Sequence, residues 1–422
     1  MIPLLFAISI FAALIAVLVR FKPVWDAGNA VKRDSLANSE GEAEMSILSA
    51  EGRGGDCPKV SVVVYSFTEE DEIFSYLEAA MNQDYPDYEV IIVNEGGAET
   101  TASLAKKLKA IYPERLYVTF IPEESRSLSR RKLAFTVGIK AASGEVVLTT
   151  TSNCRIPSRR WLTSMMRPFV EGEGIDVVLG YSHFDFDSLQ GAGKWYRQMN
   201  ATLSACQWIG AAYNRRPFRG DGNNLAFRRK LFFDCKGYSK TMHLVGGDDD
   251  IFLTEIMNRR NTTTSISADS ILVTEWGESA NRILSEQRER HQFTSWMLPC
   301  WPFLRAGLGS LMQWVMALSA LAAAVVGFLL LSGLNLSGGL DAILGWRPET
   351  NVWYAIVPAL VALGIVMLNW LAEVMIYRRT ARKLGSVCLW WSLPWFLLWH
   401  PVGNLFFKIK TLRRRRKNYT FA

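Results

Sequence analysis

Three consecutive carboxylates stand at Asp248, Asp249 and Asp250, in the segment VGGDDDI, between a Gly-Gly pair and an apolar run. Adjacent anions repel one another, so a folded domain keeps such a group where a metal ion, a cationic partner or a proton to be removed makes use of it. Aspartate is also favoured at helix N-caps and in the first helical turn. The segment therefore predicts either an acid–base site or a plain helix start.

The sequence before the triplet predicts an α/β domain that could position it. Four near-continuous apolar runs are typical of buried parallel strands: 60–66, 88–93, 116–121 and 146–150. Helical patterns fill the gaps between them: 69–82, 101–112 and 130–142. This alternation predicts a largely parallel sheet, and ligands of such sheets gather at the carboxyl ends of the strands.

Polar segments follow three of these strands, and together with later motifs they resemble a known family. The strand ends read YSFTEE, NEGGAET and TTTSNC, and further along the chain come SRRKLAFTVGIKAA, FRGDGNNLAFRRKLF, GGDDDIFLTEI and QRERH. In this order and spacing they resemble glycosyltransferase family 2, the GT-A type, over roughly residues 60–291. The resemblance implies a nucleoside-diphosphate sugar lying across the strand ends, although membership in a family does not by itself prove activity.

Carried over residue by residue, the resemblance implies a donor site of several side chains. Ser66, Phe67 and Glu69 match the loop that holds base and ribose, and Asn94 and Glu95 match the second nucleotide-binding pair. Lys132 matches a lysine near the diphosphate, where a cation offsets negative charge. A solvated helix residue is the other interpretation of Lys132.

The expected metal site is where the sequence departs from the family. The family generally has Asp-x-Asp at the end of its fourth strand, because hard oxygen ligands hold a divalent ion against the departing diphosphate. Here Thr151, Ser152 and Asn153 stand in that place. The sequence leaves open weakened binding of Mg²⁺ or Mn²⁺ through Asn153, replacement of the ion by a cation such as Arg155, Arg159 or Arg160, or loss of catalysis.

The aspartate triplet corresponds to the acceptor-side acid of the family. In an inverting transfer a carboxylate takes the proton of the acceptor hydroxyl while that oxygen attacks the anomeric carbon. By alignment this base is Asp249, with Asp248 as its acidic neighbour and Asp250 as the rival. We expect the like charges nearby to raise the proton affinity of Asp249.

Two further motifs predict acceptor or diphosphate contacts. Gly222 and Asn223 belong to a Gly-rich loop whose glycines allow close backbone approach, although a plain turn explains them equally well. Gln287 and Arg290 belong to QRERH, which resembles the Gln-x-x-Arg-Trp motif of membrane-bound processive synthases, with His291 in place of the tryptophan. Loss of the indole weakens the expectation of processivity.

Three apolar stretches predict an integral membrane protein: 1–19, 311–331 and 352–368. A cleaved signal peptide would carry basic residues before its apolar run; because Arg20 and Lys22 follow it here, we expect a retained anchor. The predicted organisation is an anchor, a linker of limited order, the GT-A domain, an interfacial helical segment, two spans with a short external loop, and a re-entrant or interfacial aromatic segment with a basic tail. Their bounds are 1–21, 22–57, 58–275, 276–308, 309–376 and 377–422.

Charge and cysteine content fix the expected surroundings. Basic residues flanking the spans predict a domain on the cytoplasmic side of the inner membrane. The net charge of +7 lies largely beside the spans and in the tail, which favours anionic lipid headgroups over nucleic acid as partners. The six cysteines have no paired CxxC spacing, which argues against a zinc site.

Two functional hypotheses from different classes follow. The first is a membrane-anchored inverting glycosyltransferase that uses a nucleotide-sugar donor and a glycan or lipid-linked acceptor in cell-envelope polysaccharide synthesis. The second is a donor-binding or scaffold subunit of a glycan-assembly complex, favoured by the missing Asp-x-Asp acids and opposed by the retained triplet. No organic cofactor is expected, because a dehydrogenase-type site would need GxGxxG after the first strand.

Overall fold

The structure is a computed structural model of the 422-residue chain. It describes residues 2–50, 57–67, 70–95, 98–122, 128–187, 189–191, 193–276, 280–331, 353–387 and 390–413. Two compact units can be separated: one consists of residues 1–25, 300–379 and 388–405, and the other of residues 26–299, 380–387 and 406–422.

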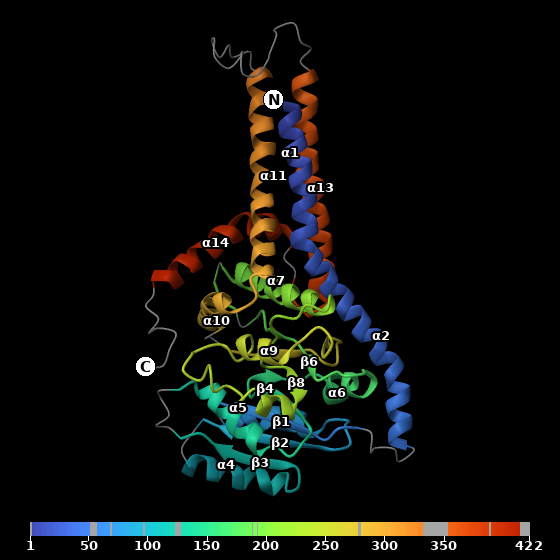
Figure 1. The fold of residues 1–422 in the computed structure, drawn as a ribbon, viewed down its shortest axis with the longest axis vertical. Helices are drawn as coiled ribbons and strands as arrows, with labels where there is room; N and C mark the ends of the chain where they lie inside the picture. Colours follow the sequence, from blue (N-terminus) through green and yellow to red (C-terminus); the bar gives the residue numbers. More distant parts are fainter. Residues whose placement is uncertain are drawn as a thin grey trace. The chain divides into compact units, whose positions relative to one another are not determined.

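The larger unit is built on a seven-stranded sheet with the strand order β3-β2-β1-β4-β8-β6-β9 (Figure 1). Its strands are β1 Val60–Ser66, β2 Tyr88–Asn94, β3 Leu116–Phe120, β4 Val146–Thr151, β6 Val177–Leu179, β8 Leu225–Arg228 and β9 Thr262–Thr264. Strands β3, β2, β1 and β4 pair in parallel, and β8 runs antiparallel to both β4 and β6. The predicted α/β class with a mostly parallel sheet is confirmed.

Helices cover both faces of this sheet. One face packs on α3 (Glu70–Met81) and α6 (Trp161–Glu171), with α4 (Ala98–Ile111) alongside, in a continuous apolar core. Each fully buried aliphatic side chain in such a core stabilises the fold by about 1.5–3 kcal/mol. The other face receives α5 (Arg130–Ala141), where a Cβ added at Gly138 would lie 2.3 Å from Cγ1 of Val63. A glycine is therefore what allows α5 to approach β1 so closely.

The remaining elements of this unit follow the first four strands. A small sheet has the order β5-β10-β7, from Cys154–Arg155, Leu272–Thr274 and Ser182–Phe184. The further helices are α7 Lys194–Tyr213, α8 Arg229–Asp234, α9 Ile251–Ile256 and α10 Ala280–Thr294.

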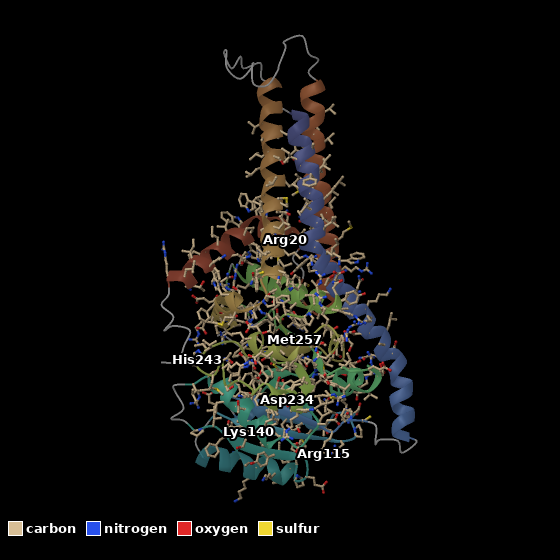
Figure 2. All side chains as sticks on the ribbon, viewed as in Figure 1. Arg20, Arg115, Lys140, Asp234, His243 and Met257 are labelled. Carbon is tan, nitrogen blue, oxygen red and sulfur yellow. The ribbon has the colours of Figure 1, made fainter. Side chains whose placement is uncertain are left out.

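At the β3 edge of the large sheet, Arg115, labelled in Figure 2, precedes β3. Its guanidinium carbon lies 5.1 Å from the centre of the Tyr88 ring.

The predicted linker is helical over residues 22–50. Helix α1 (Ile2–Ala16) continues through one π-helical turn into α2, Lys22–Ala50. Within α2, Asp34 is buried, and its Oδ2 accepts from the Thr264 hydroxyl and the Ile266 amide, both at 2.9 Å. Asn38 donates to the Ser267 hydroxyl at 2.6 Å. The Gly, Ser and Asn content predicted limited order. The helix is instead held by polar contacts with residues more than 200 positions away, which the sequence does not show.

The second unit contains helices suited to a membrane. Helices α1, α11 (Trp301–Leu331) and α13 (Trp353–Lys383) lie side by side, with Ala12 and Met316 buried between them (Figure 1). Among the described residues, three helical stretches are long and apolar enough to cross a bilayer: Ala7–Ser39, Trp301–Val325 and Leu360–Lys383. The described part of the aromatic segment after α13 contains a 3-10 turn, Trp390–Ser392, and helix α14, Leu393–Arg413.

Candidate active site at the carboxyl ends of the strands

The ends of β1 and β2 place an aromatic pair beside an acid. The Tyr65 hydroxyl donates to Glu95 Oε2, and Glu95 also forms an ion pair with Arg130. Burial, followed by the hydrogen bond to Glu95, raises the pKa of Tyr65 well above its usual range. The Phe67 ring stacks on Trp276 with centroids 5.5 Å apart. Stacked rings next to an acid are suited to holding a planar base with hydroxyl groups nearby.

Two other predicted residues of these strand ends, Ser66 and Asn94, contribute backbone hydrogen bonds. Ser66 ends β1 as a fully buried residue, and its carbonyl accepts from the Glu95 amide at 2.8 Å. Asn94 ends β2, and its carbonyl accepts from the Ile121 amide at 3.1 Å. Glu69 lies outside the described residues.

The aspartate triplet precedes α9, and its three carboxylates have different partners. Asp248 Oδ2 lies 2.7 Å from Arg131 Nε. Asp249 Oδ2 lies 3.1 Å from His291 Nε2. Asp250 is fully buried; its Oδ1 accepts from the Ile251 amide at 2.7 Å, capping α9, and its Oδ2 accepts from the Thr294 hydroxyl. Asp250 is therefore the helix start, and Asp249 faces a titratable group.

Two consecutive arginines connect the strand ends with the triplet. Arg130 and Arg131 are the first residues of α5; Arg130 pairs with Glu95 and Arg131 with Asp248. Their side chains are about three-quarters buried, at 24 % and 27 % exposure. Glu95 and the aspartate triplet are thus brought together through the first turn of α5. Sequence reasoning named the neighbouring Lys132 and missed both arginines, although all three stand in SRRK.

The electrostatics distinguish Asp249 from Asp250. Burial alone would raise the pKa of Asp249, but the charge and hydrogen bond of His291, with the charges of Arg219 and Arg131, hold it below its ordinary value. Burial, then the charge of Asp249, raises the pKa of Asp250. The expected rise in proton affinity therefore falls on Asp250, because the nearby cations face Asp249 more effectively than its like-charged neighbours do.

The Gly-rich loop lies against the triplet. A Cβ at Gly222 would lie 2.9 Å from Arg131 Nη2 and in van der Waals contact with the Asp249 Cβ at 3.4 Å, so a larger residue would displace the Arg131 guanidinium. Asn223 Oδ1 accepts from Arg131 Nη2 at 2.9 Å. Asp221, which sequence reasoning missed, accepts from the Ser182 amide at 2.7 Å, and burial raises its pKa. Its position beside Gly222 in FRGDGNN was the signal available.

Lys132 does not face a donor. Its side chain is fully buried, and Nζ donates to the carbonyl oxygens of Thr241, Leu244 and Gly246 at 2.6, 3.1 and 2.5 Å. An ammonium group has three hydrogens, so these three bonds use all of them. Burial lowers the pKa of Lys132 although the charges of Asp248, Asp250 and Asp249 oppose the shift. Lys132 fixes the loop that leads into the triplet, which corrects its assignment to the diphosphate.

The end of β4 does not offer a divalent ion the ligands it prefers. Thr151 Oγ1 donates to Asn153 Oδ1 at 2.7 Å, and Asn153 Nδ2 donates to the Glu275 carbonyl at 3.0 Å. Both ends of the Asn153 amide are therefore bonded within the protein, and the oxygens at this position are neutral. Carboxylates are the donors that such ions favour, so these residues do not fit the metal that the family implies.

The arginines considered as substitutes for that ion lie in exposed pairs instead. Arg155 pairs with Glu275, Arg159 with Asp84 and Arg160 with Asp269, at 2.8, 3.7 and 3.4 Å. The cations whose contacts reach the site acids are Arg130, Arg131 and the buried Arg219, whose Nη2 lies 3.4 Å from Asp250 Oδ2. The arginines that follow β4 in the sequence are thus not the ones that contact the acids of the site.

Helix α10 brings the QRERH motif to the triplet. His291 contacts Asp249, and the Arg290 Cβ lies against Gly246, 3.5 Å from where a Cβ would stand there. Gln287 is a partly buried residue of the same helix. Among the described residues, Asp249, Asp250 and His291 have ligand atoms within 4.8 Å of one another, as a metal-binding group would. Asp250, however, already accepts from Ile251 and Thr294.

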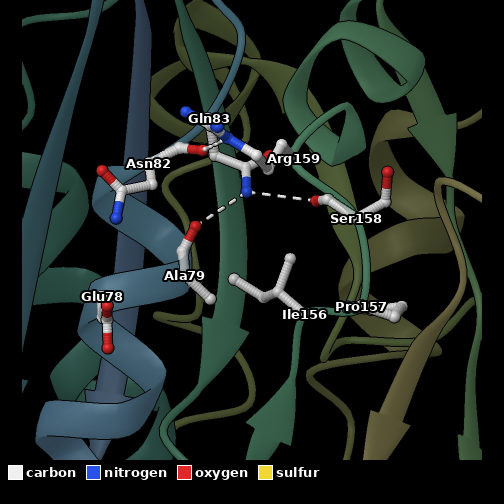
Figure 3. Close-up of a pocket in the computed structure, with 8 residues that line it drawn as sticks. All are labelled: Glu78, Ala79, Asn82, Gln83, Ile156, Pro157, Ser158 and Arg159. Atoms are coloured by element: carbon white, nitrogen blue, oxygen red, sulfur yellow. Dashed lines mark hydrogen bonds between the residues drawn. The ribbon is translucent and has the colours of Figure 1, made fainter.

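A separate cavity lies away from these residues. It is lined by Glu78, Ala79, Asn82, Gln83, Ile156, Pro157, Ser158 and Arg159 (Figure 3). Gln83 Nε2 spans it, donating to the carbonyl oxygens of Ala79 at 2.8 Å and Ser158 at 3.2 Å. None of the acids described above lines it, so we do not connect it with the chemistry of the triplet.

The sheet order and the gathering of acids at its carboxyl edge define a GT-A type α/β domain. Residues 61–236 match the family model described as glycosyl transferase family 2. Over this segment the chain is similar to that family. No curated protein matches the sequence.

Solved structures with a similar fold include three glycosyltransferases. A mannosyltransferase from Pyrobaculum calidifontis in complex with GDP-Man and Mn²⁺ is 17 % identical, with a TM-score of 0.45, covering 92 % of this chain and 99 % of that one. Glucosyl-3-phosphoglycerate synthase from Mycobacterium tuberculosis with Mn²⁺ and UDP is 15 % identical, with a TM-score of 0.36 and coverage of 56 % and 78 %. GalNAc-T7 with UDP, GalNAc and Mn²⁺ is 12 % identical, with a TM-score of 0.38 and coverage of 52 % and 44 %.

Proposed function

We propose that the protein is an inverting glycosyltransferase that moves a sugar from a nucleotide-sugar donor to a membrane-associated acceptor. The observation that carries this proposal is the pair of adjacent arginines, Arg130 on Glu95 and Arg131 on Asp248. These arginines are adjacent on α5, and through them the acid proposed for the nucleotide pocket and the acids proposed for the acceptor site are close together. A transfer reaction needs its two substrates held next to each other.

In the proposed reaction Asp249 is the general base. It is ionised at neutral pH, and it takes the proton of the acceptor hydroxyl as that oxygen forms a bond to the anomeric carbon. The bond from the anomeric carbon to the diphosphate oxygen breaks, and the diphosphate leaves with that electron pair. Arg130 and Arg131 are the cations placed to offset the charge of the leaving group. No step is assigned to a metal ion, because Thr151 and Asn153 do not fit one.

The membrane helices support a membrane-associated acceptor. Tethering the domain by α1, α11 and α13 restricts it to substrates at the bilayer surface, for which lipid-linked glycans of cell-envelope synthesis are the natural class. Basic residues flank the spans at Arg20 and Arg378, so we place the domain on the cytoplasmic side of the inner membrane. A donor-binding scaffold subunit is the second candidate, favoured by the neutral residues at Thr151 and Asn153.

The test is a donor screen followed by two matched substitutions. Purified protein with a crude lipid extract is given labelled nucleotide sugars, and products are identified by mass. Asp249→Asn should lower kcat by about 10²- to 10⁴-fold while leaving donor binding by calorimetry unchanged. Asp250→Asn, which removes the carboxylate at the α9 cap, should instead lower thermal stability. Donor binding without any transfer would support the scaffold, and full turnover by Asp249→Asn would remove it as the base.

A further inference from the structure

The contact between His291 and Asp249 has a defined direction. A carboxylate is only an acceptor, so at 3.1 Å it is the His291 Nε2 that carries the hydrogen and donates it to Asp249 Oδ2. Asp249 and His291 side chains are 19 % and 22 % exposed, so the pair is mostly desolvated yet open on one side. A hydrogen bond to a carboxylate is strong where little water competes for it, so this bond fixes the orientation of the Asp249 side chain.

The backbone that carries His291 is held independently of its imidazole. Thr294, one turn later in α10, donates to Asp250 Oδ2. Arg219 Nη2 lies 3.5 Å from the His291 carbonyl oxygen and 3.4 Å from Asp250 Oδ2. Helix α10 is therefore docked on the triplet at three points, and only one of them uses the imidazole ring. Removing the ring should leave the helix in place.

We propose that His291 is a positioning residue for the base: its Nε2–H holds Asp249 Oδ2 and leaves Oδ1 directed at the acceptor hydroxyl. This inference rests on the proposed transfer reaction. It gives QRERH a role in acid–base geometry at the position where the resembling motif has a tryptophan. The imidazole also lowers the basicity of Asp249. The contact therefore makes Asp249 a weaker base but holds its side chain in one orientation. Misplacing a reacting group by about 1 Å can cost about 100-fold in rate.

The experiment compares His291→Ala, His291→Gln and the control His243→Ala in the full-length protein with the donor found by the screen. His243, labelled in Figure 2, is an exposed histidine in the loop before the triplet. His291→Ala should lower kcat about 100-fold with donor KM unchanged. His291→Gln should recover part of that loss, because its Nε2–H can reach the same oxygen. Added imidazole should raise the rate of His291→Ala, and His243→Ala should match the wild type.

A double variant separates positioning from unrelated effects. If the two side chains act as one unit, His291→Ala should cost little more in the Asp249→Asn background. Wild-type kcat in His291→Ala, full additivity of the two losses, or a loss that Mn²⁺ but not imidazole reverses would each overturn the proposal. A wild-type chain that binds donor but transfers no sugar would overturn the proposed function itself, whereas a transferring wild type with an unaffected His291→Ala overturns only this inference.

Discussion

At the scale of single residues, three neighbouring aspartates have three separate roles. Asp248 balances Arg131, Asp249 faces His291, and Asp250 caps α9. The resemblance implied Asp249 as the base. In the structure its pKa is held below that of the neighbouring Asp250, and His291 stands on one of its oxygens as a hydrogen-bond donor. Both carboxylate oxygens of Asp250, the rival candidate, are used in hydrogen bonds to Ile251 and Thr294.

Lys132 provides a prediction about the loop before the triplet. Lys132→Met keeps the volume but leaves the carbonyl oxygens of Thr241, Leu244 and Gly246 without their donor. Each buried acceptor left unsatisfied costs about 1–3 kcal/mol. We expect a lowered melting temperature and reduced kcat, measured by thermal unfolding and by transfer assay. Lys140→Met, at an exposed position of the same helix, is the control and should change neither.

The neutral end of β4 provides a prediction about metals. Wild-type donor binding should be unchanged when Mn²⁺ or Mg²⁺ is titrated or chelated, as measured by calorimetry. Replacing both Thr151 and Asn153 with aspartate adds two carboxylates where the resembling family generally has Asp-x-Asp, and carboxylates are the ligands that divalent ions favour. We expect this double variant to gain a metal-dependent increase in donor affinity. Strong Mn²⁺ dependence of the wild type would contradict the prediction.

At the scale of elements, the position of α5 decides the geometry of the site. Its first turn supplies Arg130 and Arg131, and its Gly138 packs on Val63 of β1. Alanine is ordinarily better than glycine within a helix by about 1 kcal/mol. Here the added methyl would meet Val63 Cγ1 at 2.3 Å, so packing outweighs propensity.

Gly138→Ala should therefore destabilise the domain by about 1–3 kcal/mol and weaken donor binding, as thermal unfolding and calorimetry would show. Gly307→Ala in α11 is the matched control, because nothing lies within 4 Å of a Cβ there. An unchanged melting temperature in Gly138→Ala would mean that α5 moves away from Val63 without loss of stability. The positions of Arg130 and Arg131 would then not depend on the contact between Gly138 and Val63.

At the scale of the whole molecule, three stretches suited to crossing a bilayer predict termini on opposite sides. We expect α14 to lie at the membrane surface, so a reporter fused after Ala422 should read out as cytoplasmic, on the side proposed for the GT-A domain. The exposed Trp395, Trp399 and Phe406 suit α14 to the interface. An extracytoplasmic readout would require a fourth crossing and would reverse the proposed orientation of this segment.

The sequence by itself determined the α/β class, the four parallel strands, three membrane stretches and the identity of the acid cluster, because hydrophobic period and strand-end polarity are local properties. The tertiary structure decided which cation meets which acid. Lys132 and Arg131 are adjacent on one helix, yet the first binds loop carbonyls and the second binds Asp248. Likewise His291 meets Asp249 from 42 residues away. Such pairings depend on how elements pack, and no local pattern encodes them.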